Sequence, residues 1–217
     1  MSEHCIINRN NKKIIIKADP IETKLNYEFY RITDDTKEEC THIVADYFSK
    51  FNPVHIIAGV SYADDYVYYS AIVKRSMEDN LGFYVYSKES KRILLVYLLL
   101  DLYNYQTKPF ESEFLEKVTK SSGLYKLRGL INKLDSKNQV KCDKFGTNLF
   151  AWCVGQNKQF LPLGMLAIGD HLVFSHILKN TKYESAIGEA IDITLELAYL
   201  SKGELLGESY YVEDVLS

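Results

Sequence analysis

The sequence predicts an α/β or α+β domain of three layers, in which helices cover a mixed, mostly antiparallel central sheet, with a small hairpin at the N-terminus. Three observations predict this class. Strand-like and helical patterns are mixed along the chain, two apolar runs in its middle are typical of an antiparallel hairpin, and a strand–helix unit comes late. A chain of 217 residues that is 47% hydrophobic and 25% charged has the size and balance of one globular domain.

The N-terminal region predicts a short hairpin followed by a break. Two isoleucine-rich runs within residues 5–17 flank a polar Asn/Arg/Lys turn. Pro20 interrupts the chain, and Tyr27–Ile32 then alternates as a short strand does. We therefore expect residues 1–24 to form an arm or hairpin and residues 25–217 to form a single domain.

Two helices are expected next. An aspartate pair precedes Glu38, which stands where the acid of a capping box belongs, and apolar residues then recur at helical spacing as far as Phe51. Pro53 ends this pattern. The second helix is expected to open at Ala63–Asp65 and to continue to Asn80.

The centre of the chain predicts the core of the sheet. Leu81–Ser87 and Arg92–Leu102 are rich in Val, Ile, Leu and Tyr and are joined by the polar turn Lys88–Lys91. The second run is apolar at nearly every position, which is typical of a central strand covered on both faces. Phe110–Leu134 has a helical pattern, and Asp135–Asp143 is polar enough to be a loop.

The last third predicts a strand and further helices. After a turn at Gly155–Lys158, we expect a strand at Phe160–Ile168 and a short helical segment at His171–Leu178. The last strong helical pattern is Ala186–Leu200, which Lys202–Gly203 would close as a C-cap.

Composition excludes several classes of function. The net charge of −3 gives no excess of cations to neutralise phosphates, so we expect no nucleic-acid partner. The longest apolar run, Ile93–Leu100, is too short to cross a bilayer, so we expect no membrane partner. No CxxC pair occurs among the four cysteines, and the histidines are scattered, so no metal site is expected. These features indicate a cytoplasmic protein with reduced thiols.

The expected start of the last helix has the composition of a phosphate-binding site. Small residues at Ala186 and Gly188 would let backbone N–H groups approach a pyrophosphate. The residues leave open the alternative that these small side chains serve only close packing.

Three stretches of the chain carry a family resemblance. They are Tyr47–Pro53 with Ala58–Val60, Ser76–Tyr86 with Ile93–Tyr97, and Leu163–Ile168 with Ala186–Ala190 and Leu195–Ala198. In their order and spacing they resemble the GNAT superfamily of N-acetyltransferases, in its arylalkylamine N-acetyltransferase-like branch.

The resemblance implies acetyl-CoA as co-substrate. By analogy with the family, pantetheine would pair with the backbone of a strand at Leu166, Ala167 and Ile168. The pyrophosphate would rest on the start of the last helix, where the helix dipole favours an anion. The residues implied there are Ala186, Ile187, Gly188 and Glu189.

The same resemblance implies direct acetyl transfer to a small amine, which needs a base to take the proton of the amine. A Glu that serves as base in the family aligns with Asn52, whose amide cannot do so, and His55 is the nearby candidate. The alternative is a catalytically inactive GNAT-like domain that binds CoA or a partner protein. The sequence leaves a homodimer open.

Overall fold

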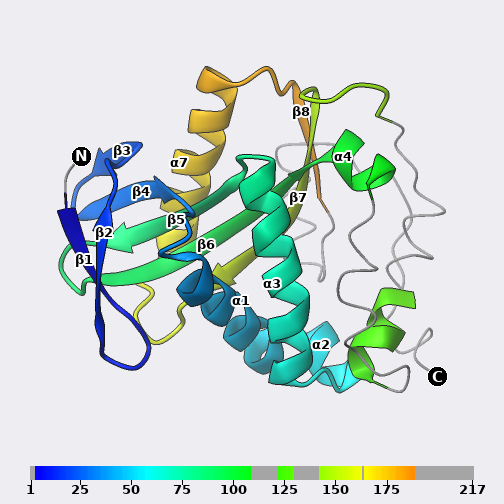
Figure 1. Ribbon diagram of the computed structural model, residues 1–217, viewed down its shortest axis with the longest axis horizontal. Coiled ribbons are helices and arrows are strands. Elements are labelled where there is room, and N and C mark those ends of the chain that lie inside the picture. Colours follow the sequence, from blue (N-terminus) through cyan, green and yellow to red (C-terminus); the bar gives the residue numbers. More distant parts are fainter. Residues whose placement is uncertain (1–2, 109–121, 130–141, 163, 189–217) are drawn as a thin grey trace.

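The structure, a computed structural model, describes residues 3–108, 122–129, 142–162 and 164–188, and its centre is a six-stranded mixed sheet (Figure 1). The strands lie in the order β3-β4-β5-β6-β7-β8. Neighbours are antiparallel except β7 and β8, which are parallel. Their bounds are β3 Glu22–Lys24, β4 Tyr27–Arg31, β5 Gly82–Ser87, β6 Arg92–Asp101, β7 Asn148–Gln156 and β8 Ser185–Gly188. The chain therefore has a mixed α/β fold.

Helices cover both faces of this sheet. Helices α1 (Lys37–Phe51) and α3 (Tyr62–Glu78) lie on one face, and α7 (Met165–Asn180) lies on the other (Figure 1). Successive side chains of β5 alternate between the two faces, because a strand has a period of two. Tyr84 belongs to the core cluster beneath α1 and α3, whereas Phe83 belongs to the cluster beneath α7. Every residue of β6 after its first is buried, which confirms the expected central strand.

The predicted helices α1 and α3 are confirmed, with different caps. Helix α1 follows Thr36 rather than the aspartate pair, and its N-cap side chain forms no capping hydrogen bond. Helix α3 follows Ser61, whose Oγ accepts a hydrogen bond of 3.1 Å from the backbone N–H of Asp64.

A short helix, α2 (Pro53–Ala58), starts at the proline that was expected only to end a helix. The side chain of Asn52 accepts hydrogen bonds from the backbone N–H groups of Val54 and His55. Proline suits the first helical position, where its missing N–H would have no partner. Gly59, with φ of 69°, closes α2 in the left-handed conformation.

The predicted N-terminal hairpin is present as β1 (Glu3–Ile7) and β2 (Lys13–Lys17), which form a separate two-stranded sheet. It is fixed to the turn between β5 and β6: the N–H of Ile7 donates to Lys91 O at 2.8 Å, and Arg92 Nη1 donates to Asn8 O at 2.6 Å. The boundary expected at residue 24 stays a prediction, and β3 pairs with the larger sheet.

The C-terminal third differs from the sequence-based expectation. The strand expected at Phe160–Ile168 is wrong, because α7 begins at Met165. The helix expected at Ala186–Leu200 is wrong at its start, because Ser185–Gly188 forms β8, and its remainder lies outside the described residues. A short apolar run suits either a buried strand or a buried helix, so its periodicity does not separate the two.

Two further expectations concern the middle of the chain. Of the helical pattern at Phe110–Leu134, the structure describes residues 122–129, which are helical over 123–129. Strand β7 was not expected and includes the start of the predicted turn at Gly155–Lys158. Helix α4 (Leu102–Thr107) follows β6 directly, and Asp101 caps it by accepting a hydrogen bond from Asn104 N–H.

Candidate functional site

A polar groove of about 580 Å³ runs along α1, beside the hairpin turn and the segment that follows β7. Its volume is in the range of small-molecule sites, about 300–1,000 Å³. The lining residues that bear on its chemistry are Arg9, Glu39, His42, Tyr62, Arg92 and Phe160. The groove lies at the carboxyl end of β7, beside the start of the antiparallel neighbour β6.

Helix α1 supplies one wall of the groove. Glu39, His42 and Asp46 are three and four residues apart, so they lie on one face of the helix. Cys40 and Val44, on another face, are 0% exposed and belong to the core beneath α1 and α3. The apolar stripe thus fixes which polar side chains α1 presents to the groove.

A cluster of three side chains, Arg9, His42 and Tyr62, forms one end of the groove. Arg9 Nη1 donates to the hydroxyl of Tyr62 at 2.9 Å, and it also contacts Nδ1 of His42. The Tyr62 hydroxyl is hydrogen-bonded to the same Nδ1. The rings of His42 and Tyr62 are nearly parallel, at 3°, with centroids 6.2 Å apart.

This cluster fixes the tautomer of His42. A guanidinium has donors only, so Nδ1 of His42 accepts and the ring proton belongs on Nε2. Burial and the charge of Arg9 lower the pKa of His42 below its usual 6.5, although Glu38 opposes the shift. The imidazole is therefore neutral at pH 7, and its basic nitrogen faces the Tyr62 hydroxyl.

Glu39 is the most buried acid of the groove, at 7% exposure. Its Oε1 accepts a hydrogen bond of 3.0 Å from the backbone N–H of Arg9. Burial raises the pKa of Glu39, against this hydrogen bond and the charges of Arg9 and Arg92. Within the described residues no hydrogen bond to its Oε2 is formed, so this oxygen is available to a cationic ligand.

The sequence-predicted candidate base, His55, lies elsewhere. It is 5% exposed, its Nδ1 is 2.8 Å from Oδ1 of Asp65, and its ring packs against Phe48 and Tyr69. It is not among the groove-lining residues. His55 and Asp65 thus form a buried contact that links α2 to α3. A catalytic role for His55 stays a prediction.

The residues expected to bind the cofactor do not occupy the expected elements. Leu166, Ala167 and Ile168 lie in the first turns of α7 instead of on a strand. Ala186, Ile187 and Gly188 lie in β8, paired with Leu149, Phe150 and Ala151 of β7, instead of at a helix start. Glu189 lies outside the described residues. A cofactor role for these positions stays a prediction, although they do not form the strand and the helix start that the prediction assumed.

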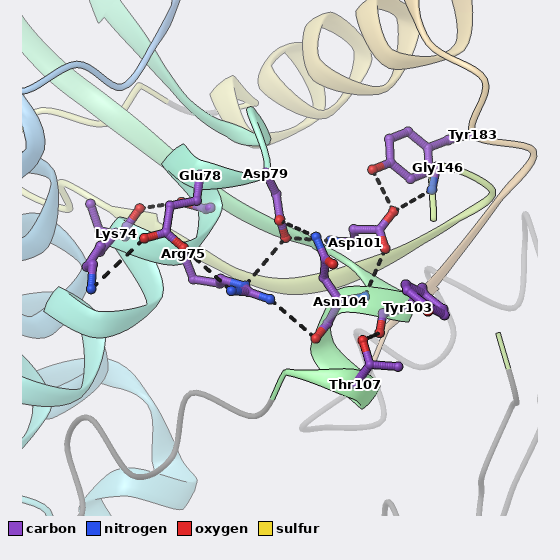
Figure 2. A network of polar contacts seen from close by, with 12 residues as sticks. Lys74, Arg75, Glu78, Asp79, Asp101, Tyr103, Asn104, Thr107, Gly146 and Tyr183 are labelled. Carbon is purple, nitrogen blue, oxygen red and sulfur yellow. Dashed lines mark hydrogen bonds and ion pairs between the residues drawn. The ribbon is translucent and has the colours of Figure 1, made fainter. Parts of the chain in front are cut away.

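A second polar network joins the end of β6 to the segment before β8 (Figure 2). Asp101, 0% exposed, accepts hydrogen bonds from Asn104 N–H at 3.0 Å, Gly146 N–H at 2.8 Å and the Tyr183 hydroxyl at 2.9 Å. Burial and the bond to Asp101 raise the pKa of Tyr183. Every donor is directed at a buried carboxylate, so this network fixes the ends of α4, β7 and β8.

The described ranges contain neither a cluster of metal ligands nor a membrane-spanning helix. No three His, Cys, Asp or Glu side chains in this part of the chain come together as metal ligands would. None of its helices is both long enough and apolar enough to cross a bilayer.

Sequence reasoning missed the cluster of Arg9, His42 and Tyr62. The spacing of Glu39, His42 and Asp46 is a signal that could have identified a polar stripe on α1. Nothing in the sequence indicates that Arg9, which is 33 residues from His42, contacts it.

Comparisons with known proteins give a fold and no family. No protein-family model matches the sequence, and no curated protein matches it significantly. A similar solved structure is the C-terminal condensation domain of Ebony in complex with beta-alanyl-dopamine. The TM-score is 0.65 at 16% identity, over 82% of this chain and 83% of that chain.

This similarity corrects the functional interpretation of the sequence. The resemblance to the GNAT superfamily was wrong, because the matching fold is that of a condensation domain. The function implied by that resemblance, an acetyl-CoA-dependent N-acetyltransferase, is overturned by the same finding. Two of the segments that carried the resemblance, Leu163–Ile168 and Ala186–Ala190, contain the start of α7 and most of β8. At 16% identity, what the comparison supports is a shared fold alone.

Proposed function

We propose that this chain is an acyltransferase-like domain that joins an activated acyl group to a small amine and binds the amine in the groove along α1. The observation that carries the proposal is the likeness to the Ebony condensation domain across 82% of the chain. The ligand of that structure, beta-alanyl-dopamine, is an amide of an acyl group and an arylalkylamine. Amide formation of this kind is the chemistry that we carry over.

The groove suits an amine that carries an aromatic ring on its alkyl chain. Glu39 is a half-satisfied carboxylate that can hold an ammonium or a polarised amine N–H. Phe160 and Tyr62 offer aromatic surface on the same groove. Arg92 lies over the ring of Phe160, with its Cζ 4.7 Å from the centroid, and holds that ring in place.

The reaction needs a proton acceptor. An amine that attacks an acyl carbon becomes positively charged, and the amide forms only when a base removes one N–H proton. The pKa of His42 is lowered, so its imidazole is neutral at pH 7 and has a lone pair that can accept a proton. Both the acid that binds the amine and the base that deprotonates it thus come from α1.

The test measures binding and amide formation. Isothermal titration with dopamine and with beta-alanyl-dopamine is compared in the unchanged protein, Glu39→Gln and Glu78→Gln. Glu78 is the control, because its side chain is 50% exposed and it does not line this groove. We expect Glu39→Gln to weaken amine binding by about tenfold, as loss of a charge-assisted hydrogen bond does, and Glu78→Gln to leave it unchanged.

Amide formation is measured by mass spectrometry, with beta-alanyl thioesters and adenylates as donors and dopamine or tyramine as acceptor. The expected result is an amide whose yield falls in Glu39→Gln. Absence of both binding and product with all donors would overturn the proposal.

A further inference from the structure

We infer that Tyr62 is the proton-transfer group of the groove: its phenol takes a proton from the bound amine as it passes its own proton to Nδ1 of His42. That the proton comes from an amine rests on the proposed function. That the phenol of Tyr62 is polarised is inferred only from the contacts of Tyr62, His42 and Arg9.

The hydrogen bonds set the direction of transfer. Nδ1 of His42 accepts, because Arg9 offers it only donors, so the Tyr62 hydroxyl is a donor to Nδ1. The phenol oxygen in turn accepts a hydrogen bond of 2.9 Å from Arg9. A positive charge thus lies against the oxygen that loses the proton, and a neutral base lies against the proton itself. This is the arrangement that activates a hydroxyl by an adjacent base.

Exposure decides which of the two groups meets the ligand. The Tyr62 side chain is at the groove and 36% of the residue is exposed, whereas the His42 side chain is 11% exposed. Nδ1 of His42 is covered by Arg9 and Tyr62, and Nε2 is 3.7 Å from Oε1 of Glu38. A proton from a ligand in the groove therefore reaches Nδ1 through the Tyr62 oxygen.

Proton transfer through Tyr62 accompanies formation of the amide bond. The amine nitrogen bonds to the acyl carbon of a thioester or adenylate, and the carbonyl oxygen takes the π electron pair. One N–H proton moves to the Tyr62 oxygen while the phenol proton moves to Nδ1 of His42. The carbonyl re-forms, and the leaving group departs with the electron pair of its bond to carbon. The proton gained at Nδ1 then passes back through the Tyr62 oxygen to water, which restores the phenol of Tyr62 and the neutral His42 with its ring proton on Nε2.

The surroundings of His42 tune this proton acceptor. Arg9 opposes formation of the imidazolium, while Glu38 and Asp46 favour it. Tyr66 also packs against the His42 ring, with centroids 4.5 Å apart, and its centroid is 6.3 Å from that of Tyr62. Among the described contacts the hydroxyl of Tyr66 makes no hydrogen bond to His42, so Tyr66 is a neighbour of similar chemistry outside the relay.

Phenol reactivity tests the relay without any substrate. An aryl sulfonyl fluoride forms an S–O bond to a tyrosine as fluoride leaves and the phenol proton passes to a base. Peptide mapping gives the labelling rate of Tyr62 against that of Tyr125, which is 40% exposed and so matches Tyr62 in access. We expect Tyr62 to react at least about tenfold faster.

The variant His42→Phe keeps a ring against Tyr62 and removes Nδ1. It should bring the rate at Tyr62 down to that of Tyr125, with circular dichroism unchanged. Equal rates at Tyr62 and Tyr125 in the unchanged protein, or an unaltered Tyr62 rate in His42→Phe, would overturn the inference.

The steady-state kinetics of amide formation provide a second test of the relay. Tyr62→Phe should lower kcat for amide formation by about a hundredfold with little change in KM, whereas Tyr66→Phe should leave both unchanged. An active Tyr62→Phe refutes the relay and leaves the proposed function intact. If the unchanged protein forms no amide, the proposed function is refuted, and with it the amine as the source of the proton. The labelling rates then still decide whether Tyr62 transfers its proton to His42.

Discussion

Nδ1 of His55 lies 2.8 Å from Oδ1 of Asp65, and neither residue is more than 5% exposed. This pair joins α2, which contains His55, to the first turn of α3, which contains Asp65. The second oxygen of Asp65 is buried and has no hydrogen-bond partner among the described residues. Burial raises the pKa of Asp65 against the influence of His55, so this joint depends on the imidazole.

The first prediction follows from that dependence. His55→Ala should lower the free energy of unfolding by about 3 kcal/mol, because it leaves a buried carboxyl without its partner and a void beside Phe48. Urea unfolding followed by circular dichroism measures the change. The double variant His55→Ala/Asp65→Ala should lose less than the sum of the single losses. Strict additivity would show that the two side chains do not interact.

The second prediction concerns the network of Figure 2. Asp101→Ala should lower the free energy of unfolding by about 3 kcal/mol, since it removes the cap of α4 and leaves two donors unpaired. Tyr183→Phe removes one of these donors and should cost about 1 kcal/mol. Chemical denaturation of the two variants measures both losses and shows which is larger. A loss in Tyr183→Phe as large as in Asp101→Ala would contradict the account.

The third prediction concerns the approach of α1 to β7. A Cβ on Gly155 would lie 2.8 Å from Cα of Val44 and 2.5 Å from its Cγ2. Gly155→Ala should therefore destabilise the fold by about 2 kcal/mol, because backbone has to move. Gly129→Ala is the control: a Cβ there meets nothing within 4 Å, in a helical segment that alanine stabilises by up to about 1 kcal/mol. Equal thermal stabilities of the two variants would refute the close approach.

The fourth prediction concerns acid. Burial and the charge of Arg31 lower the pKa of His176 below 6.5, while Glu22 opposes them, and the ring packs edge-on against Phe29 and Phe83. A folded-state pKa below the unfolded value gives stability that is present above pH 6.5 and is lost as pH falls through the folded pKa. The free energy of unfolding of His176→Phe should thus fall less than that of the unchanged protein between pH 7.5 and about pH 5. Parallel curves would be the contrary result.

Elements with long, regular patterns could be predicted from the sequence. The apolar spacing up to Phe51 and the continuous apolar run from Arg92 predict α1 and β6, and both are present. Shorter runs were ambiguous. Phe160–Ile168 was expected as a strand, but α7 begins at Met165. Gly169 lies so close to β6 that a Cβ would be 2.4 Å from the Tyr97 hydroxyl, so tertiary packing fits a helix there.

The candidate site was harder to predict than the fold. His42 and Asp46 share a helix face that the spacing of α1 implies. Arg9 comes from a hairpin turn, and its position beside Tyr62 depends on how that hairpin packs on the turn between β5 and β6. Pattern reasoning describes single elements, and a groove formed by several of them requires their packing.

The place of Arg9 on the N-terminal hairpin has a practical consequence. A chain cut between Lys17 and Glu22 would retain every strand of the larger sheet and lose the guanidinium that contacts Tyr62. It would also lose Ile6 and Ile16, which are 1% exposed and belong to the core. Proteolytic removal of this hairpin would thus remove the Arg9 contact with Tyr62 and part of the core together.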